Sequence, residues 1–192
     1  MFDPAEWPTV PEGIMRQIPD ILKPVDTLTT DLPMWFTRQP GYLRLSRNEV
    51  ITIGAVRFRD RDGVVWNCPA GFPTDGMSYP ILVRLLFDRF ARRTRRPATT
   101  HDFRYAMNDY IRNWPDTRRK ADEGLLDGLR LEEWFWARTD YIAVRLGGQG
   151  VYDRQSREAA MIQWLDLCDE GYEAIEEYIQ EMIEQYGEAA IF

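Results

Sequence analysis

Residues that commonly build metal centres and redox sites are scarce in this chain. Its 192 residues include one histidine, His101, and two cysteines, Cys68 and Cys168. The cysteines lie far apart, form no CxxC pair and have no second histidine to complete a zinc site. We therefore expect both to be thiols of the hydrophobic core in a reducing compartment.

Long apolar runs and an excess of positive charge are also missing. No stretch approaches the ~18 apolar residues of a membrane span, and the first residues lack the basic start and apolar run of a signal peptide. The 24 basic residues are outnumbered by 31 acidic ones, for a net charge of −7, which argues against general nucleic-acid binding. GxSxG, P-loop and HExxH motifs are absent. We expect a soluble protein made in a cytoplasm.

The charge that is present is unevenly distributed. Residues 84–96 contain six arginines and one acid, Asp88, whereas residues 153–192 contain eleven acids and two arginines. A solvated basic face and an acidic outer helix explain this distribution. The alternative is a basic patch that meets phosphate or an acidic neighbour.

The chain divides into an N-terminal arm (1–40), a core (41–150) and a C-terminal helical extension (151–192). The arm holds seven of the twelve prolines, which exclude a long helix or a central strand. It is also rich in apolar residues, so we expect an extended arm that lies on a surface of its own domain or of another subunit.

The core pattern predicts strands first and helices afterwards. Alternating apolar residues indicate strands between Tyr42 and Asn67, with a turn at residues 60–63, and a loop follows at residues 69–76. Helices are expected from about Pro80, around His101, from residues 116–117, and from about Trp134 to Leu146. The predicted fold class is α+β: a small antiparallel sheet packed by four or five helices. Trp134, Phe135 and Trp136 are expected to act as packing or interface anchors rather than as a sugar platform.

The extension has the most regular pattern in the chain. Apolar residues form a heptad seam in one long helix over about residues 154–186, at Met161, Leu165, Cys168, Tyr172, Ile175, Ile179, Met182 and Tyr186. This helix packs lengthwise either on its own domain or on a helix of another chain.

The candidate site centres on His101, because histidine is the side chain whose ordinary pKa suits acid–base chemistry at neutral pH. In a helix, His101 and Tyr105 share a face while Asp102 points about 100° away. Asp122, on the next helix, is placed to bind the far ring nitrogen of His101, and Asp102 then remains for a hard cation. The alternative is a histidine that only caps or packs a helix.

These residues, His101, Asp102, Tyr105 and Asp122, resemble the His-Asp-x-x-Tyr … Asp pattern of phospholipases A2. The resemblance covers about 22 residues and implies that the histidine activates water, that the aspartate beside it binds Ca²⁺, and that Tyr105 and Asp122 orient the histidine. The disulfides and the calcium loop of the secreted enzymes are not found here.

A second resemblance covers about 80 residues. The segments Pro69–Pro80, Thr100–Tyr105, Arg119–Asp122 and Tyr141–Gly148 resemble a family of uncharacterised phage and prophage proteins with the pattern PxGFxTDGxSxP, HDxxY, RxxAD and AVRxxG. This resemblance implies a tailed-phage origin. Asp75, within the first segment, is expected to close a turn before Gly76, the alternative being that it assists His101 or a cation.

Two functions follow. The first is a virion-associated tail, neck or head–tail protein that assembles with itself or with other virion proteins through residues 1–40 and the 161–186 seam. The second is a phospholipase A2-like lipid esterase with His101 as general base. The first accounts for more of the chain and is ranked higher. Its expected location is the host cytoplasm during synthesis and then the virion.

Overall fold

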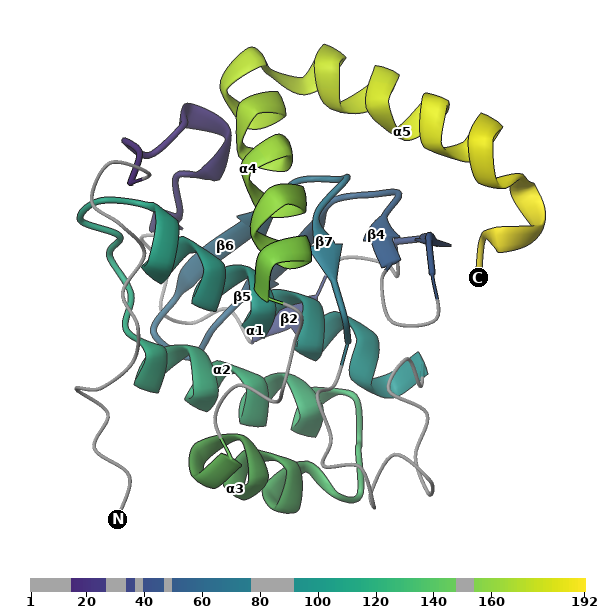
Figure 1. Cartoon of the computed structure of the whole chain (residues 1–192). Helices are drawn as coiled ribbons and strands as arrows, with labels where there is room; N and C mark the ends of the chain where they lie inside the picture. The colour runs from purple at the N-terminus through teal and green to yellow at the C-terminus, as the bar shows by residue number, and fades with distance from the viewer. Residues whose placement is uncertain (1–14, 27–33, 37–39, 47–49, 77–91, 148–153) are drawn as a thin grey trace.

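The computed structural model describes residues 15–26, 34–36, 40–46, 50–76, 92–147 and 154–192. Within these residues the fold is α+β, as predicted, with two small antiparallel sheets and five α-helices (Figure 1). None of the helices in this part of the chain has the length and apolar character to cross a membrane. The predicted helix near Pro80 lies outside the described residues.

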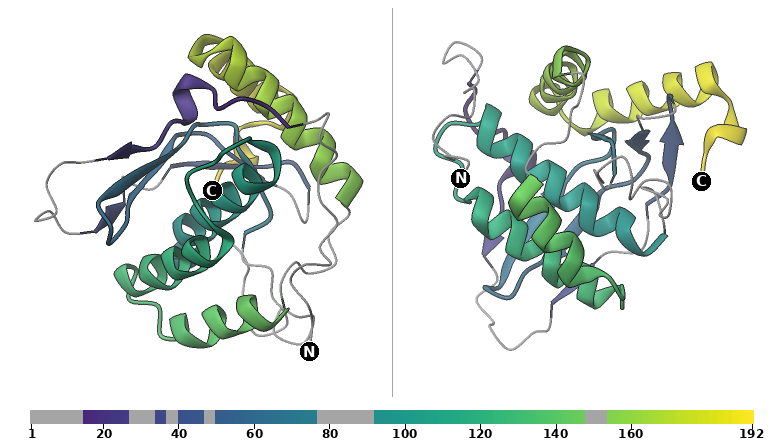
Figure 2. Two further views of the ribbon diagram at one scale, coloured as in Figure 1. Left: turned by 90° about the vertical axis from the view of Figure 1, so that its left-hand side faces the viewer. Right: turned by 60° about the horizontal axis from the view of Figure 1, so that its bottom comes forward.

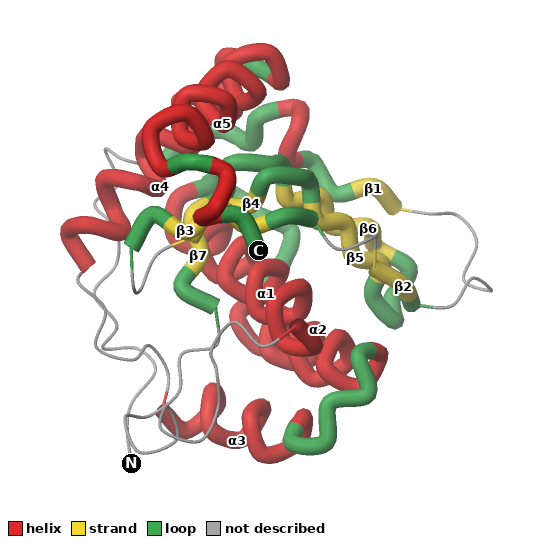
Figure 3. The backbone as a smooth tube through the Cα atoms, turned by 90° about the vertical axis from the view of Figure 1, so that its right-hand side faces the viewer, coloured by secondary structure: helices red, strands yellow, loops and turns green. Residues whose placement is uncertain are grey.

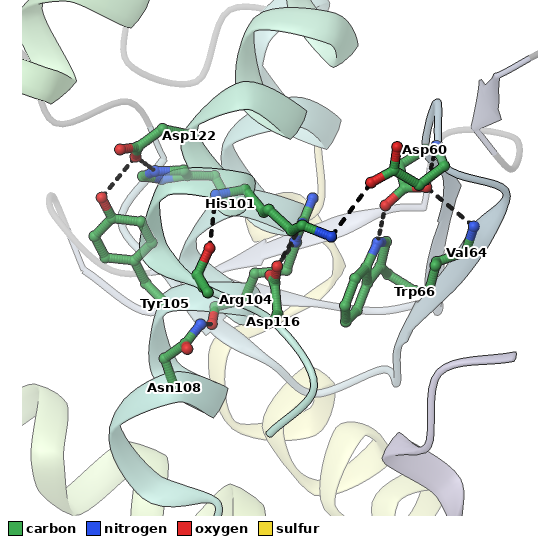
Figure 4. Close-up of polar contacts among 12 residues, drawn as sticks. Asp60, Val64, Trp66, His101, Arg104, Tyr105, Asn108, Asp116 and Asp122 are labelled. Atoms are coloured by element: carbon green, nitrogen blue, oxygen red, sulfur yellow. Dashed lines mark hydrogen bonds and ion pairs between the residues drawn. The ribbon is translucent and has the colours of Figure 1, made fainter. Parts of the chain in front are cut away.

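The larger sheet is built around one hairpin. Its strand order is β1-β6-β5-β2, with β1 at Val25–Asp26, β6 at Val64–Cys68, β5 at Val56–Arg59 and β2 at Trp35–Phe36. The predicted turn joins β5 to β6: the Asp60 carboxylate accepts hydrogen bonds from the amides of Asp62 and Val64 and from the indole of Trp66 (Figure 4). One side chain thus fixes the turn and the start of β6.

The second sheet has the order β3-β4-β7, with β3 at Tyr42–Arg44, β4 at Val50–Thr52 and β7 at Pro73–Thr74. At β3, the amide of Phe192 donates to the carbonyl of Tyr42 and the amide of Tyr42 donates to the carbonyl of Phe192. The chain therefore returns at its C-terminal end to the edge of β3.

The described part of the N-terminal arm lies on its own domain. Its strands β1 and β2 form the two edges of the larger sheet, and Leu22, in the 3-10 helix Asp20–Leu22, is completely buried in the main core. The sheet region therefore extends from residue 25 to residue 74, beyond the predicted 42–67. Strands of two residues are too short to leave an alternating pattern, and only their partners define them.

Three helices form successive layers beside the sheets. Helix α1 (Arg92–Tyr110) contacts β5, β6 and β7, α2 (Arg118–Leu131) packs on α1, and α3 (Ala137–Gly147) packs on α2 (Figure 2). The Thr117 hydroxyl accepts the amide of Lys120 and caps the start of α2, at the position that the sequence predicts.

The predicted single C-terminal helix is wrong, because the structure breaks it at Gly171. Helix α4 (Arg154–Glu170) and helix α5 (Tyr172–Tyr186) run in different directions (Figure 3), and Gly171 has a φ of 112° that a residue with a side chain rarely adopts. Five seam residues are buried in this chain's own core: Met161, Leu165, Cys168, Ile175 and Ile179. At these positions the seam is covered by the chain itself, so the alternative of a partner helix is wrong there.

Aromatic side chains differ sharply in environment. Phe72, Phe103 and Trp164 meet edge to face in the main core. Phe135 and Trp136, between α2 and α3, are instead 87% and 42% exposed, so core packing does not explain them.

Candidate functional site

His101 and Tyr105 project from the same face of α1, one helical turn apart. Their ring centroids are 4.3 Å apart. The side chain of His101 is only 11% exposed. The helix thus presents the imidazole and the phenol together, as the spacing predicts.

Asp122, on α2, contacts the imidazole of His101 and the phenol of Tyr105. His101 Nε2 lies 2.9 Å from Oδ1 of Asp122, and the Tyr105 hydroxyl donates to the same oxygen at 2.6 Å (Figure 4). The predicted contact between the far ring nitrogen of His101 and Asp122 is confirmed. A carboxylate in this position fixes the ring orientation and the tautomer of the histidine.

Arg145, on α3, completes the surroundings of Asp122. Its Nη1 donates to Oδ2 of Asp122 at 2.8 Å, and its side chain is 44% exposed, whereas that of Asp122 is 1% exposed. Sequence reasoning did not place Arg145 in the site. The sequence contained one indication of this role: Arg145 is the arginine of the AVRxxG segment, a charged residue at a fixed place in the pattern.

The three donors determine the charge of Asp122. Burial raises the pKa of the carboxyl, but the hydrogen bonds from His101, Arg145 and Tyr105 outweigh it and hold the pKa below its ordinary value of 3.8. Asp122 is therefore an ionised carboxylate in the protein interior. The phenol of Tyr105 is affected in the opposite way, since burial and the charge of Asp122 raise its pKa.

Asp102 approaches the other side of the imidazole. Its Oδ1 lies 3.8 Å from His101 Nδ1, beyond hydrogen-bond distance, and its Oδ2 accepts the hydroxyl proton of Thr74 at 2.5 Å. The Thr74 oxygen accepts the amide of Gly76 at 3.1 Å, so Thr74 helps to shape the turn at Gly76. Asp102 thereby links the loop at β7 to α1. Residue 77 lies outside the described residues, and the turn predicted at Asp75 stays a prediction.

Two carboxylates on either side make His101 more basic. Burial lowers the pKa of the imidazole, but Asp102 and Asp122 together outweigh it, so the pKa of His101 is raised above its ordinary value of 6.5. The ring therefore takes up a proton readily near neutral pH, and its Nδ1 edge is the one that Asp122 does not occupy.

The calcium ion implied by the phospholipase resemblance does not fit the described residues. One oxygen of Asp102 already accepts the Thr74 hydroxyl, and the other faces the imidazole. Within the described part of the chain, no group of three or more acidic, histidine or cysteine side chains is arranged to hold a metal. Ca²⁺ requires six to eight oxygen ligands, so we derive no chemical step from a metal here.

The site joins residues from four separate sequence segments. Thr74 comes from the loop segment, His101, Asp102 and Tyr105 from α1, Asp122 from α2 and Arg145 from α3. Another charged pair that involves this helix is structural: Arg104 binds Asp116 through two hydrogen bonds, with both side chains buried.

Comparison with known proteins gives one match. No curated protein and no solved structure matches the chain. Residues 52–144 match the model of a family described as "Protein of unknown function (DUF1353)". This range contains Thr74, His101, Asp102, Tyr105 and Asp122 and ends just before Arg145. Over residues 52–144 the chain is thus similar to an uncharacterised domain family.

Proposed function

We propose that the protein is a hydrolase in which His101 activates water, with a phospholipid carboxylic ester as its substrate. The observation that carries this proposal is the pair of contacts to Asp122, 2.9 Å from His101 Nε2 and 2.6 Å from the Tyr105 hydroxyl. A buried carboxylate that orients the imidazole leaves Nδ1 directed away from it. This is the arrangement that a general base requires.

In the proposed reaction, Nδ1 of His101 removes a proton from water while the water oxygen bonds to the ester carbonyl carbon. The protonated imidazole then gives this proton to the departing alcohol as the ester C–O bond breaks. Asp122 stabilises the imidazolium throughout and, because Arg145 and Tyr105 bind it, does not take the proton itself.

Arg145 also supplies positive charge at the edge of the site. The exposed part of the Arg145 side chain lies beside Asp122. The guanidinium of Arg118 lies 5.4 Å from the centre of the Tyr105 ring. Both cations have a carboxylate partner, Arg145 in Asp122 and Arg118 in Asp109, so we assign them to holding Asp122 and Tyr105 in place rather than to the ester oxygen.

The test is release of fatty acid from phospholipid vesicles by the wild-type protein, His101→Ala and Asp122→Asn. We expect wild-type release, a loss of at least about 10²–10⁴-fold in His101→Ala, and a large loss in Asp122→Asn. Asn108→Ala is the matched control, because Asn108 lies on α1 and, among the described residues, its side chain donates to the carbonyl of Arg104 and not to the site. No release by the wild-type protein, or equal release by His101→Ala, would remove the proposal.

The second candidate is the virion-associated assembly protein that the whole sequence favours, present in the host cytoplasm and then in the particle. The exposed aromatic residues Phe135 and Trp136 support it, because such side chains typically anchor interfaces. Mass spectrometry of purified virions for peptides of this chain tests it. A His101→Ala phage that assembles normally while the purified variant has lost lipid hydrolysis is expected if both functions coexist.

A further inference from the structure

Exposed apolar side chains follow one another in the chain from the end of α2 into α3. They are Leu131, Phe135, Trp136 and Ile142, which are 40%, 87%, 42% and 48% exposed. The rings of Phe135 and Trp136 meet edge to face with centroids 5.2 Å apart, so the two form one projecting unit. We name these four residues the aromatic surface.

Exposed arginines lie next to the aromatic surface, in the hollow at Leu131 and at neighbouring positions in the chain. Arg92 and Arg93 begin α1, Arg130 precedes Leu131, and Arg138 follows Trp136, and all four are exposed. Arg92, Arg93 and Leu131 line the same hollow of about 360 Å³, which connects the basic start of α1 to the apolar residues. Glu132, in the same hollow, is bound by Arg96. Glu133, also in the hollow, is exposed, so the surface is apolar at its centre and has more arginines than acids at its rim.

Helix α5 has the complementary character. It contains five glutamates and no lysine or arginine: Glu173, Glu176, Glu177, Glu181 and Glu184. All five are exposed, and Tyr172 and Tyr186 at the helix ends are 51% and 40% exposed. Like charges four residues apart, as at 173, 177 and 181, destabilise a helix, so a basic partner would relieve this repulsion.

The two surfaces cannot meet within one molecule. Figures 1 and 3 both place α3 and α5 at opposite ends of the fold, with the sheets and α1 between them. Contact between them thus requires two copies, and it joins different surfaces on each copy, which gives a head-to-tail arrangement.

We infer that the chain self-associates head to tail, the aromatic surface of one copy binding the acidic face of α5 of the next. Phe135 and Trp136 bury apolar area against one of the two tyrosines at the ends of α5, and the arginine rim pairs with the glutamates of the helix. The inference is independent of the proposed hydrolase activity, because neither surface includes His101 or Asp122.

Two variants, each defective in one surface, test the inference by analytical ultracentrifugation. The first is Phe135→Asp, and the second is the double substitution Glu177→Lys with Glu181→Lys. The wild-type protein should increase in mass with concentration, and its association should weaken at least about tenfold as salt rises from ~50 to ~500 mM. Each variant alone should remain monomeric.

The decisive sample is an equimolar mixture of the two variants. The Phe135→Asp copy keeps an intact α5 and the other copy keeps an intact aromatic surface, so the mixture should form a complex of two chains and no more. Asp20→Lys, which reverses an exposed charge outside both surfaces, should associate like the wild type. Circular dichroism confirms that each variant is folded.

Three results would overturn the inference. They are a wild-type protein that stays monomeric at low salt, a mixture that stays monomeric, and variants that associate as strongly as the wild type. Binding of the wild-type protein to vesicles of anionic phospholipid without self-association would assign the aromatic surface to a membrane instead.

Discussion

Nη1 of Arg145 lies 2.8 Å from Oδ2 of Asp122, so α3 is fastened to the carboxylate that also holds His101. The third layer of helices is thereby connected to the first through one buried side chain of the second. The stability of the fold and the orientation of the imidazole therefore both depend on the carboxylate of Asp122.

Substituting Asp122 should destabilise the protein strongly. Asp122→Asn removes the negative charge that three donors share, and we expect the free energy of unfolding to fall by about 3–5 kcal/mol. Urea denaturation measures it. Asp109→Asn is the control, because Asp109 pairs with Arg118 at a partly exposed position and should cost less than ~1 kcal/mol. Equal losses of unfolding free energy in Asp122→Asn and Asp109→Asn would contradict the prediction that the buried contacts of Asp122 stabilise the fold.

The single histidine makes a direct titration feasible. The carboxylates of Asp102 and Asp122 raise the pKa of His101 above 6.5, so the midpoint of its imidazole NMR signal should lie above that value. A midpoint at or below 6.5 would show that burial outweighs the two carboxylates.

The same shift predicts how stability depends on pH. The folded-state pKa is the higher one, so the contribution of His101 is complete below about pH 6.5 and is lost as pH rises through the folded-state pKa. The difference in unfolding free energy between the wild type and His101→Gln should therefore shrink above neutral pH. For Asp122, whose pKa is lowered, stability is instead lost as pH falls below 3.8 through the folded-state value.

Close contact between α1 and α2 depends on Gly128. A Cβ atom there would lie 2.9 Å from Phe36 Cζ and 3.1 Å from Pro97 Cβ. We expect Gly128→Ala to destabilise the protein by about 1–3 kcal/mol, although alanine favours a helix over glycine by about 1 kcal/mol. Thermal unfolding measures the effect, with the exposed Arg119→Ala as a control on the same helix. A higher unfolding temperature for Gly128→Ala would contradict the prediction, because it would mean that α1 and α2 move apart to fit the methyl group at no net cost.

The buried ion pair of Arg104 and Asp116 gives a further test. The guanidinium makes two hydrogen bonds to Asp116, at 2.6 and 2.9 Å, and lies 4.4 Å from the centre of the Trp66 ring. Arg104→Ala should cost about 3–5 kcal/mol because it leaves a buried carboxylate alone. Arg104→Lys keeps the charge but not the paired geometry, so chemical denaturation should place it between the wild type and Arg104→Ala.

The sequence by itself determined the fold class, the hairpin at residues 60–63, the start of α2 near residues 116–117 and the pairing of His101 with Asp122. Most of these features depend on local patterns: alternation, helical spacing and turn residues. The contact of His101 with Asp122 joins two helices, and the motif that contains both residues indicated it. The motif spacing indicated that the His101, Asp102, Tyr105 and Asp122 segments belong together.

Only the tertiary structure decided the rest. Strands β1 and β2 exist because the hairpin offers two edges, and Arg145 joins the site because α3 packs on α2. The heptad spacing continues numerically through Gly171, but the backbone turns there so that residues on both sides reach one core. Thr74 meets Asp102 for the same reason: long-range packing sets these contacts, and no local pattern in the sequence records them.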